Sequence, residues 1–493
     1  MIQNVDIGSM KQFNKGLNTQ KNLFDVSLGQ SPACIDVDFN EDGSLNKRLG
    51  TSTMNTTVLE STAGYGMFDF KINITPQARR LICSAGTGIY YSTNVGRTFS
   101  IIHTSRAAVL NHFSLIDNYV VNTNRNYQTP LYWAGSTGVN FSTIADVVPL
   151  CKYSIYHQGY FILLNETNNP LSMYYVIKDS MFNGPYSTFK FLTEKNDEII
   201  GAFILNNILF ISTKYKIFRL TYNSGGNPDW IYSEVRNFGF TPLSFKKILI
   251  PNVGEVIIGL DWDKKIRIFN GSTDEIISTH IQRNNTLTPF YLDNINIDYI
   301  DTSWAEDDKQ AQLYRLYVPY GTSPTITHCL VYDYRIGAFY PYQTQAYQSG
   351  ILAEGTARDL HMLACDYNGR IHQVDSGNTD AGTAINEYYF SPLLYNQTPT
   401  RVSKFQQVDL YFSVSSSGTL YFEDRNQFSN VWSLRKTFTL GSAISSTIIR
   451  QSIDIPENMN VYQFKVSSSA NKADSWQLNI VDYTHTVAGV GVP

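Results

Sequence analysis

The sequence predicts an all-β protein, built from a β-propeller and a β-sandwich. Aromatic residues make up 14% of the 493 residues, with 33 Tyr and 28 Phe, and these residues favour strands over helices. Charged residues are only 16%, below the roughly 25% that is usual for globular domains. Short strand-like runs bounded by Gly, Asn and Asp recur along most of the chain. The length also predicts more than one domain.

Residues 61–384 carry the repeating pattern and are expected to form the propeller. In each repeat, a hydrophobic run, a polar turn and an alternating run follow one another, which is typical of a β-hairpin. Such runs occupy residues 80–84, 88–92, 160–164, 208–212, 216–220, 256–260 and 265–269. The hairpins recur about every 40 to 55 residues, which is the spacing of propeller blades. Their centres lie near residues 90, 125, 165, 210, 260, 325 and 365, and six or seven blades are both compatible with this spacing.

Residues 92–99, Ser-Thr-Asn-Val-Gly-Arg-Thr-Phe, resemble the Asp-box, a turn on the outer hairpins of many propeller blades with the pattern S-x-D-x-G-x-T-W/F. Asn94 stands in place of Asp, and Phe99 in place of Trp. An Asx side chain that folds back on the backbone, a Gly that allows positive φ and an aromatic plug predict a tight turn between two strands. Residues 136–141 are a weaker version of the same pattern.

The two ends of the chain lack the repeating hairpin pattern of residues 61–384. Residues 1–60 predict an irregular arm, which either supplies the strand that closes the propeller or reaches a neighbouring subunit. Residues 385–493 predict a separate antiparallel β-sandwich, since strand-like runs such as 408–414 and 461–466 recur about every ten residues. The best helical segment, residues 307–313, is only about two turns long.

Composition excludes several classes of protein. The 38 Lys and Arg against 42 Asp and Glu give a net charge of −4, and no basic stripe offers a grip on DNA phosphates. No secretory signal or membrane-spanning segment is expected, and therefore no stable membrane insertion. The five Cys are odd in number and widely spread, so we expect buried free thiols and neither a disulfide framework nor a metal site. These residues are Cys34, Cys83, Cys151, Cys329 and Cys365.

No motif predicts a catalytic residue, a cofactor or a metal. The carboxylates in segments 261–263 and 307–308 could serve acid–base chemistry, but their Gly- and Asn-rich surroundings favour turns and solvated edges. Residues 366–369, Asp-Tyr-Asn-Gly, begin like a calcium loop but lack the later carboxylates, which favours a β-turn. His361 and His372 are the nearest His residues to each other, and we expect no metal between them. A sialidase-like glycosidase would carry an N-terminal Arg-Ile-Pro signature, which is missing, so we expect the protein not to be an enzyme.

Three groups of residues, at the start, in the late middle and before the C-terminal region, form a recognisable set. The first is Phe-Asn-Lys-Gly-Leu-Asn at 13–18 with the segments 31–39 and 41–50. The second is Val-Tyr-Asp-Tyr-Arg-Ile-Gly-Ala-Phe at 331–339, and the third is 366–377, which runs on into 379–385. In this order they resemble the tail nozzle, tail-tube or tail-hub β-propeller proteins of short-tailed bacteriophages. That family usually has Arg-Pro-Gly where this chain has Leu49 between Arg48 and Gly50.

The resemblance implies a structural virion protein. Such subunits form a cyclic homo-oligomer, commonly a hexamer, below the phage portal and adaptor proteins, carry tail fibres outside and conduct genome DNA inside during ejection. The expected location is the virion tail, after assembly in the host cytoplasm. A Tyr-rich surface suits subunit contacts, and a bore without a Lys and Arg lining lets DNA pass without stable binding. The alternatives are a receptor-binding or decoration virion protein and, less favoured, a sialidase-like propeller glycosidase.

Overall fold

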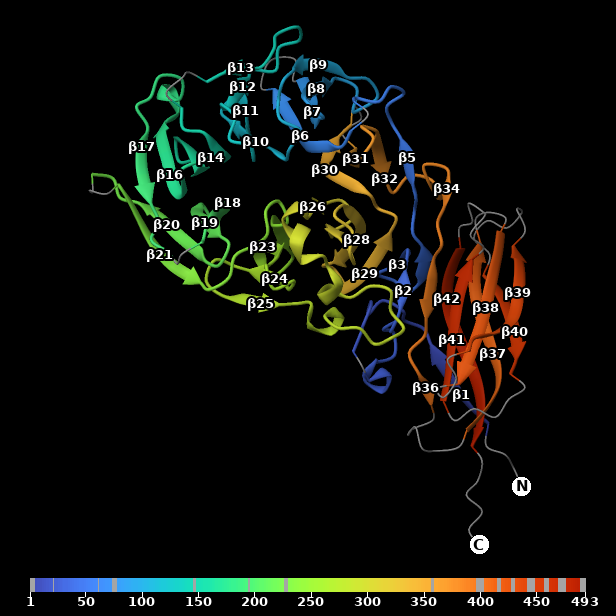
Figure 1. The fold of residues 1–493 in the computed structure, drawn as a ribbon. Coiled ribbons are helices and arrows are strands. Elements are labelled where there is room, and N and C mark those ends of the chain that lie inside the picture. The colour runs from blue at the N-terminus through green and yellow to red at the C-terminus, as the bar shows by residue number, and fades with distance from the viewer. Residues whose placement is uncertain are drawn as a thin grey trace.

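We describe the fold in a computed structural model. It describes residues 5–20, 22–60, 62–72, 78–144, 148–193, 196–225, 229–355, 359–395, 403–414, 418–426, 431–440, 448–455, 461–468 and 476–487. These residues form a ring of β-sheets with a β-sandwich beside it (Figure 1). The all-β class and the propeller predicted from the sequence are therefore confirmed.

The ring contains six four-stranded antiparallel sheets whose strands lie in sequence order, as neighbouring hairpins require. The first three sheets are β6 (Gly64–Ile72), β7 (Ala78–Ala85), β8 (Gly88–Ser92) and β9 (Ser100–His103); β10 (Asn111–Ile116), β11 (Tyr119–Asn124), β12 (Leu131–Trp133) and β13 (Ser142–Thr143); and β14 (Cys151–His157), β15 (Tyr160–Glu166), β16 (Asn169–Ile177) and β17 (Ser187–Lys190). The next three are β18 (Ile199–Leu205), β19 (Ile208–Thr213), β20 (Ile217–Tyr222) and β21 (Trp230–Arg236); β22 (Lys246–Ile250), β23 (Gly254–Leu260), β24 (Ile266–Phe269) and β25 (Asp274–Ile276); and β26 (Trp304–Asp308), β27 (Leu313–Pro319), β28 (Ile326–Asp333) and β29 (Ala338–Gln343).

The last sheet closes the ring with a strand from the N-terminal region. It runs β30 (Tyr347–Glu354), β31 (Leu360–Asp366), β32 (Ile371–Val374), β5 (Thr51–Thr53), β33 (Thr379–Asp380) and β34 (Thr383–Ala384). Strand β5 pairs antiparallel with β32, with Thr51 opposite Val374. The six four-stranded sheets and this one make seven blades, which decides between the two blade counts. An N-terminal strand in the last blade joins the two ends of the ring, so its first and last blades cannot separate without breaking a ladder.

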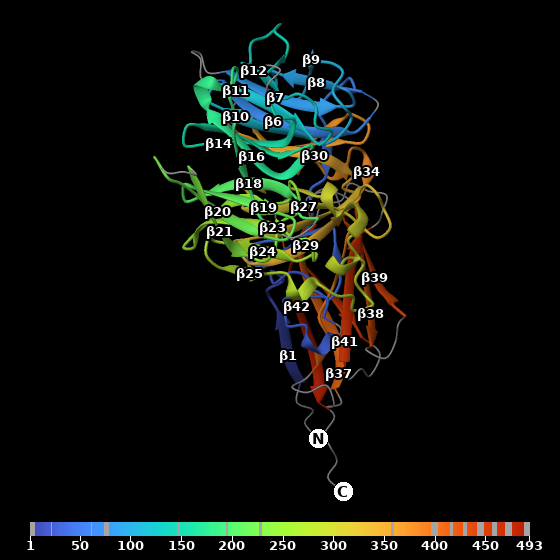
Figure 2. The same ribbon diagram turned by 60° about the vertical axis from the view of Figure 1, so that its left-hand side comes forward.

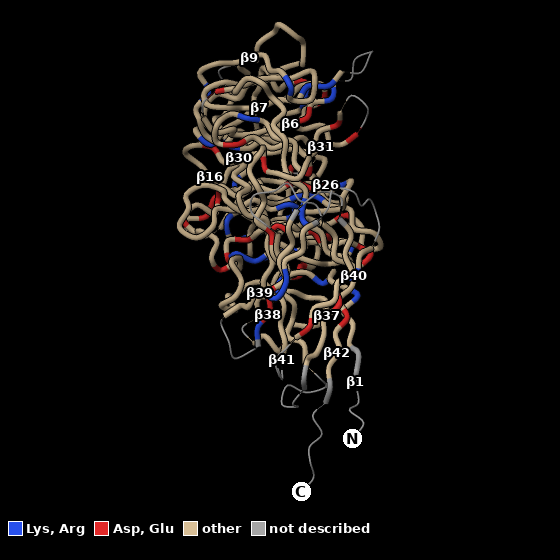
Figure 3. The backbone as a smooth tube through the Cα atoms, turned by 90° about the vertical axis from the view of Figure 1, so that its right-hand side faces the viewer, with Lys and Arg blue, Asp and Glu red and all other residues tan. Residues whose placement is uncertain are grey.

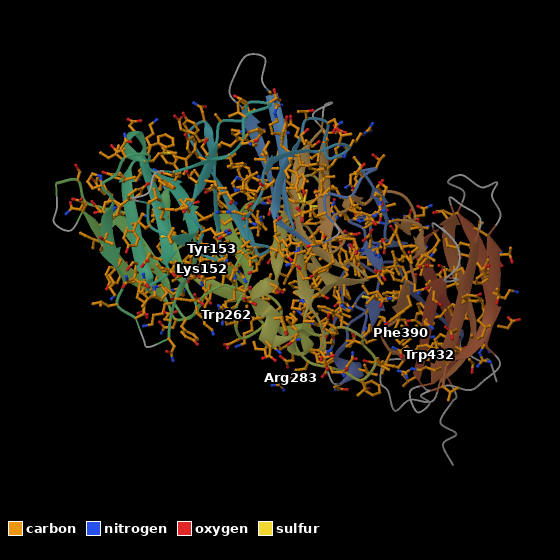
Figure 4. All side chains as sticks on the ribbon, turned by 45° about the horizontal axis from the view of Figure 1, so that its top comes forward. Lys152, Tyr153, Trp262, Arg283, Phe390 and Trp432 are labelled. Carbon is orange, nitrogen blue, oxygen red and sulfur yellow. The ribbon has the colours of Figure 1, made fainter. Side chains whose placement is uncertain are left out.

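The sandwich packs two sheets face to face and draws strands from both ends of the chain. One sheet has the order β3 (Val37–Phe39), β4 (Leu45–Lys47), β42 (Trp476–Val487), β37 (Ser403–Val414) and β40 (Ile449–Asp454), with β1 (Val5–Met10) also on β42. The other has the order β2 (Cys34–Ile35), β35 (Tyr388–Phe390), β41 (Val461–Ser468), β38 (Gly418–Asn426) and β39 (Ser433–Leu440), with β36 (Leu394–Tyr395) on β41. Aromatic side chains pack against each other in the sandwich. The ring centres of Phe390 and Trp432, for example, lie 4.6 Å apart (Figure 4).

The N-terminal region supplies the strand that closes the propeller, which was one of its two predicted roles, but it is not an irregular arm. It supplies four strands to the sandwich and one to the last blade. Strands β2 to β5 are only two or three residues long, which is too short for an alternating pattern to show. Their partners are also more than 300 residues away in several ladders, as where Thr51 pairs with Val374, so no local signal marks them.

The best helical segment of the sequence, residues 307–313, forms no helix. This segment is the end of β26, a turn and the start of β27, with Asp308 opposite Leu313. The described helices are short 3₁₀ turns: η1 (Leu23–Asp25), η2 (Lys178–Ser180), η3 (Thr279–Ile281), η4 (Leu292–Asn294) and η5 (Ile297–Thr302). Nowhere in the described residues is a helix long and apolar enough to cross a membrane.

One hydrophobic core runs from the sandwich into the propeller. It includes Phe412 and Phe464 of the sandwich, Phe39 of the N-terminal region and Tyr317 of β27, all at most 1% exposed. The sandwich lies beside the blades of β26–β29 and β30–β32, with the blades of β14–β21 on the far side of the ring (Figures 1 and 2). Because the two parts share a core, they form one body rather than two domains on a hinge.

Candidate functional site

The three marker segments, which lie far apart in the sequence, meet at the junction between propeller and sandwich. Gly50 at the end of the first segment lies against the third: its N–H donates to the Gly377 carbonyl at 2.7 Å, and the Ser376 N–H donates to the Gly50 carbonyl at 2.8 Å. A Cβ at Gly50 would overlap the backbone of Thr379. Glycine is thus required here by close backbone approach.

The first segment also packs against the second. The Leu17 N–H donates to the Phe339 carbonyl at 2.7 Å. Gly16 has a φ of +74°, and a Cβ there would lie 2.8 Å from the backbone nitrogen and oxygen of Phe339. Both the backbone conformation and the lack of space therefore require glycine at position 16.

Arg48 joins the sandwich strands to the last blade. Its Nε donates to Asp36 at 2.6 Å, and its two Nη atoms donate to Asp380 at 2.6 and 2.9 Å. The guanidinium also lies 5.2 Å from the centre of the Tyr342 ring. The Arg48 side chain is 2% exposed, so these contacts replace nearly all of its hydration. A planar fork of donors suits two carboxylates better than the point charge of Lys would.

Two further buried cations form ion pairs at the same junction. Arg315 of β27 is 1% exposed and pairs with Asp375 and, at 3.5 Å, with Asp308. Lys47 lies 3.6 Å from Glu387, which also accepts a hydrogen bond from the Trp476 indole at 2.8 Å. Buried charges of this kind specify one arrangement of the packed parts, because any slip leaves a charge without its partner.

Sequence reasoning placed Asp307 and Asp308 at a solvated edge, and this was wrong. They are 4% and 6% exposed. Asp308 faces Arg315, and Asp307 accepts a hydrogen bond from the Tyr334 hydroxyl at 3.2 Å. The partners come from β27 and from the turn after β28, so the local sequence around the two carboxylates gave no sign of them.

The two carboxylates of segment 261–263 lie in different environments. Asp261 is 2% exposed and pairs with Arg267 at 2.6 Å, whereas Asp263 is exposed and lies 3.5 Å from Lys265. Arg267 also bridges to Asp274 at 2.7 Å, so this ion pair joins β24 to β25. These contacts stabilise a blade and leave no free acid–base pair in the segment.

Residues 366–369 form the predicted turn. The Asp366 carboxylate accepts from the backbone N–H groups of Asn368 and Arg370 at 2.8 and 2.9 Å, and Gly369 has a φ of +74°. Asp366 also lies 3.2 Å from His372, while His361 pairs with Asp359 at 2.7 Å. The two His residues therefore have separate partners. Among the described residues, no three His, Cys, Asp or Glu side chains are placed to hold a metal ion.

The Asp-box pattern forms the turn expected of it, between the third and fourth strands of its blade. The Ser92 hydroxyl accepts from the Gly96 N–H at 3.0 Å, and the Asn94 side-chain oxygen accepts from the Thr98 N–H at 3.0 Å. Gly96 has a φ of +85°, and Phe99 packs on the core between the first and last blades. The Asn thus does the backbone capping that the pattern assigns to Asp.

The centre of the propeller is a cavity of about 280 Å³. The innermost strands of all seven blades line it, with Phe68, Phe113, Tyr153, Ala202, Lys246, Trp304 and Ile351 among the lining residues. Figure 4 labels Tyr153 on β14. Lys246 is paired with Glu306 at 2.6 Å, and burial followed by the nearby Lys246 charge lowers the pKa of His112 to about 4. The lining is therefore mainly aromatic and aliphatic, with a neutral His near neutral pH.

Two carboxylates near the junction predict a pH dependence of stability. Burial and then the Asp375 charge raise the pKa of Asp38 to about 6, and burial raises the pKa of Asp307 to about 6. Both lie above the unfolded value of about 3.9, so their stabilising contribution is complete below about pH 4 and is lost as the pH rises through about 6. Between pH 5 and pH 7.5, the two carboxyls together should cost the parent protein about 2–3 kcal/mol of stability. We expect the double variant Asp38→Asn and Asp307→Asn to lack this pH-dependent loss.

Urea unfolding of both proteins at pH 5 and pH 7.5 measures this difference. Glu198 is a useful contrast, because hydrogen bonds from Lys152 and Asn165 outweigh burial and lower its pKa. Its contribution is lost only at pH values below that range, so Glu198→Gln should leave the difference unchanged. An equal pH dependence in the double variant and the parent protein would contradict the prediction.

The residues that matter most at the junction were only partly visible in the sequence. Arg48 and Gly50 lie inside the first marker segment, and Asp375 and Asp380 lie in the third and its continuation, whereas Arg315 lies in none of them. Only the structure pairs Arg48 with Asp380, 332 positions away, and Arg315 with Asp375, 60 positions away.

Comparisons with known proteins give only distant similarities to solved structures. Neither a protein-family model nor a curated protein matches the sequence. Among solved structures, a KlHsv2 variant with loop 6CD replaced by a Gly-Ser linker is 11% identical, with 68% of this chain and 95% of that chain covered and a TM-score of 0.35. BBS1N in complex with ARL6DN is 8% identical over 66% and 97% of the two chains, with a TM-score of 0.41.

A third similar structure is an exo-β-1,3-galactanase from Phanerochaete chrysosporium with galactose. It is 10% identical, covers 89% of this chain and 100% of its own, and has a TM-score of 0.26. Similarities this low carry no argument about substrates or partners. The assignment of the propeller rests on the order and pairing of the strands.

Proposed function

We propose that this protein is a structural subunit of the tail of a short-tailed phage and not an enzyme. In this proposal, copies of the chain form a closed ring, a nozzle or hub, below the portal and adaptor proteins. Tail fibres attach outside and genome DNA passes through the bore during ejection. The protein is assembled in the host cytoplasm and resides in the virion tail.

The observation that carries the proposal is the meeting of all three marker segments at one buried junction. They resemble tail proteins in sequence order, and their contacts join the propeller, the closing strand and the sandwich. A cyclic oligomer needs this kind of rigidity, because each subunit must present two contact surfaces at a fixed angle for the ring to close. Marker residues whose contacts join parts of the fold also favour an architectural role over a ligand site.

The path of DNA would lie between subunits and not through a propeller. The central cavity of about 280 Å³ is lined by aromatic side chains. It is far too small for duplex DNA, whose major groove alone is about 12 Å wide. A bore of sufficient width therefore requires several copies around a common axis.

The charge distribution is compatible with transient passage of DNA. Lys and Arg are interspersed with Asp and Glu along the described chain, without a stripe of one sign (Figure 3). Many of these charges form pairs, such as Lys152 with Glu198 and Arg79 with Glu354. Paired charges release few counterions from DNA and so bind it weakly.

Electron microscopy and light scattering of the purified protein test the proposal. We expect closed hollow rings of one copy number, alone or after addition of a portal–adaptor complex from a short-tailed phage. Monomers or trimers that bind host cells and do not join that complex would favour the receptor-binding alternative. Turnover of fluorogenic sialosides or of a glycan panel would contradict the non-enzymatic part of the proposal.

A further inference from the structure

The first and last blades meet along a buried seam. We use this word for the core cluster that joins β6 and β7 to β30, β31 and β32, namely Met67, Leu81, Cys83, Ala353, Leu363, Cys365 and Ile371. An ion pair between Arg79 and Glu354, at 2.9 Å, crosses it near the surface. The seam is where the two ends of the propeller come together, so its strength determines how firmly the ring is closed.

Two cysteines face each other across the seam. Cys83 lies on β7 and Cys365 on β31, the second strands of the first and last blades, and both side chains are 0% exposed. Both side chains belong to the buried cluster of the seam, and the Cys83 thiol donates to the Ser84 carbonyl at 3.8 Å. The Cys83 thiol also contributes to the raised pKa of the Cys365 thiol, so the two thiols interact across the seam.

A glycine makes room for this pair. Gly64 of β6 lies next to Cys365, and a Cβ at this position would overlap the Cys365 sulfur. Gly64 has no positive φ that would require glycine. The lack of a side chain there thus leaves space for the Cys365 thiol.

We propose that Cys83 and Cys365 are a site of reversible oxidation, at which a disulfide covalently joins the first and last blades of the propeller. A small disulfide such as glutathione disulfide is the oxidant. One Cys thiolate attacks it, which forms a mixed disulfide and releases one glutathione thiolate. The second Cys thiolate then displaces the other glutathione. One sulfur–sulfur bond breaks and one forms, the oxidant gains two electrons, and the two thiol protons pass to the two leaving thiolates.

The folded seam makes this reaction slow. The hydrogen bond to Cys83, followed by burial, raises the pKa of the Cys365 thiol, so little thiolate is present. Oxidation therefore requires local opening of the seam, and the resulting bond then opposes further opening. A protein made in a reducing compartment would acquire the bond after release into an oxidising one. This inference does not depend on tail assembly.

The other three cysteines serve as internal controls. Cys34 of β2 and Cys329 of β28 belong to the core that the sandwich and the propeller share, and not to the seam. Cys151 belongs to a separate core cluster on β14. Oxidation of the folded protein should leave all three as thiols.

Thiol counting and peptide mapping test the proposal. The folded protein is incubated with glutathione disulfide at a urea concentration at which hydrogen exchange shows that β7 opens, then alkylated and digested without reduction. We expect the number of thiols to fall from five to three, with a linked peptide that contains Cys83 and Cys365. The unfolding midpoint should rise by about 5 °C, and dithiothreitol should reverse this shift.

Variants separate this pair from other reactions. Cys83→Ser and Cys365→Ser should each keep four thiols after oxidation, whereas the matched control Cys329→Ser should fall from four to two. The mapping of the parent protein decides the question even if a variant fails to fold. Five remaining thiols under conditions in which β7 exchanges, or a dominant cross-link to another cysteine, would overturn the proposal.

Discussion

Replacement of Arg48 by Met is expected to lower the free energy of unfolding by about 3–5 kcal/mol, because it leaves two carboxylates unpaired inside the junction. Asp36 and Asp380 share this guanidinium, and its side chain is 2% exposed. Chemical denaturation followed by Trp fluorescence and far-UV circular dichroism measures the loss. Hydrogen exchange should locate it on both sides of the junction, in β32 of the last blade and in the sandwich strands β3 and β4.

Two controls make this experiment specific. Arg450→Ala removes a guanidinium that also pairs with a carboxylate, Asp409 at 2.7 Å, but its side chain is 58% exposed, so little change is expected. Adding Asp36→Asn and Asp380→Asn to Arg48→Met should restore part of the stability, since the buried charges are then gone. A loss in Arg48→Met no larger than in Arg450→Ala would show that the junction is not held by this ion pair.

Deletion of residues 1–50 is expected to abolish the folded sandwich. The deletion removes β1 to β4, and with them buried side chains of its core such as Phe13, Val37, Phe39 and Leu45. Each large buried side chain contributes about 1.5–3 kcal/mol, so the loss exceeds the roughly 5–15 kcal/mol by which a domain is stable. Size-exclusion chromatography and near-UV circular dichroism should show aggregation or a loss of packed aromatic side chains.

Two other truncations separate the sandwich from the closure of the ring. Removal of residues 1–4, which precede β1, should leave the fold intact. Removal of residues 1–55 also takes β5 and should further expose β32 to hydrogen exchange, since its ladder partner is gone. A protein lacking residues 1–50 that elutes and melts like the full chain would contradict the role assigned to the N-terminal strands.

The parts of the candidate site that could be predicted from the sequence are those held by interactions between near neighbours in the chain. The Asp-box turn at Ser92 to Phe99 and the turn at Asp366 to Gly369 could be predicted, because their hydrogen bonds join residues within four positions of each other. The functions of Arg48 and Arg315 could be predicted only in part. Asp36 and Asp308 lie in the same local hairpins as these arginines, but Asp380 and Asp375 lie 332 and 60 positions away. The same holds for Cys83 and Cys365, whose spacing in the sequence suggested two unrelated buried thiols.

The class of the fold, the hairpin spacing of the blades and the local turns could be predicted from the sequence. These follow from side-chain alternation and turn chemistry, which act between near neighbours. The sequence also offered the closure of the ring by an N-terminal strand as one of two alternatives. The structure was needed to choose it, to place four N-terminal strands in the sandwich and to show that residues 307–313 form a hairpin. The strands concerned are too short to show a pattern, and their stability comes from partners that the chain brings close only when the ring has closed.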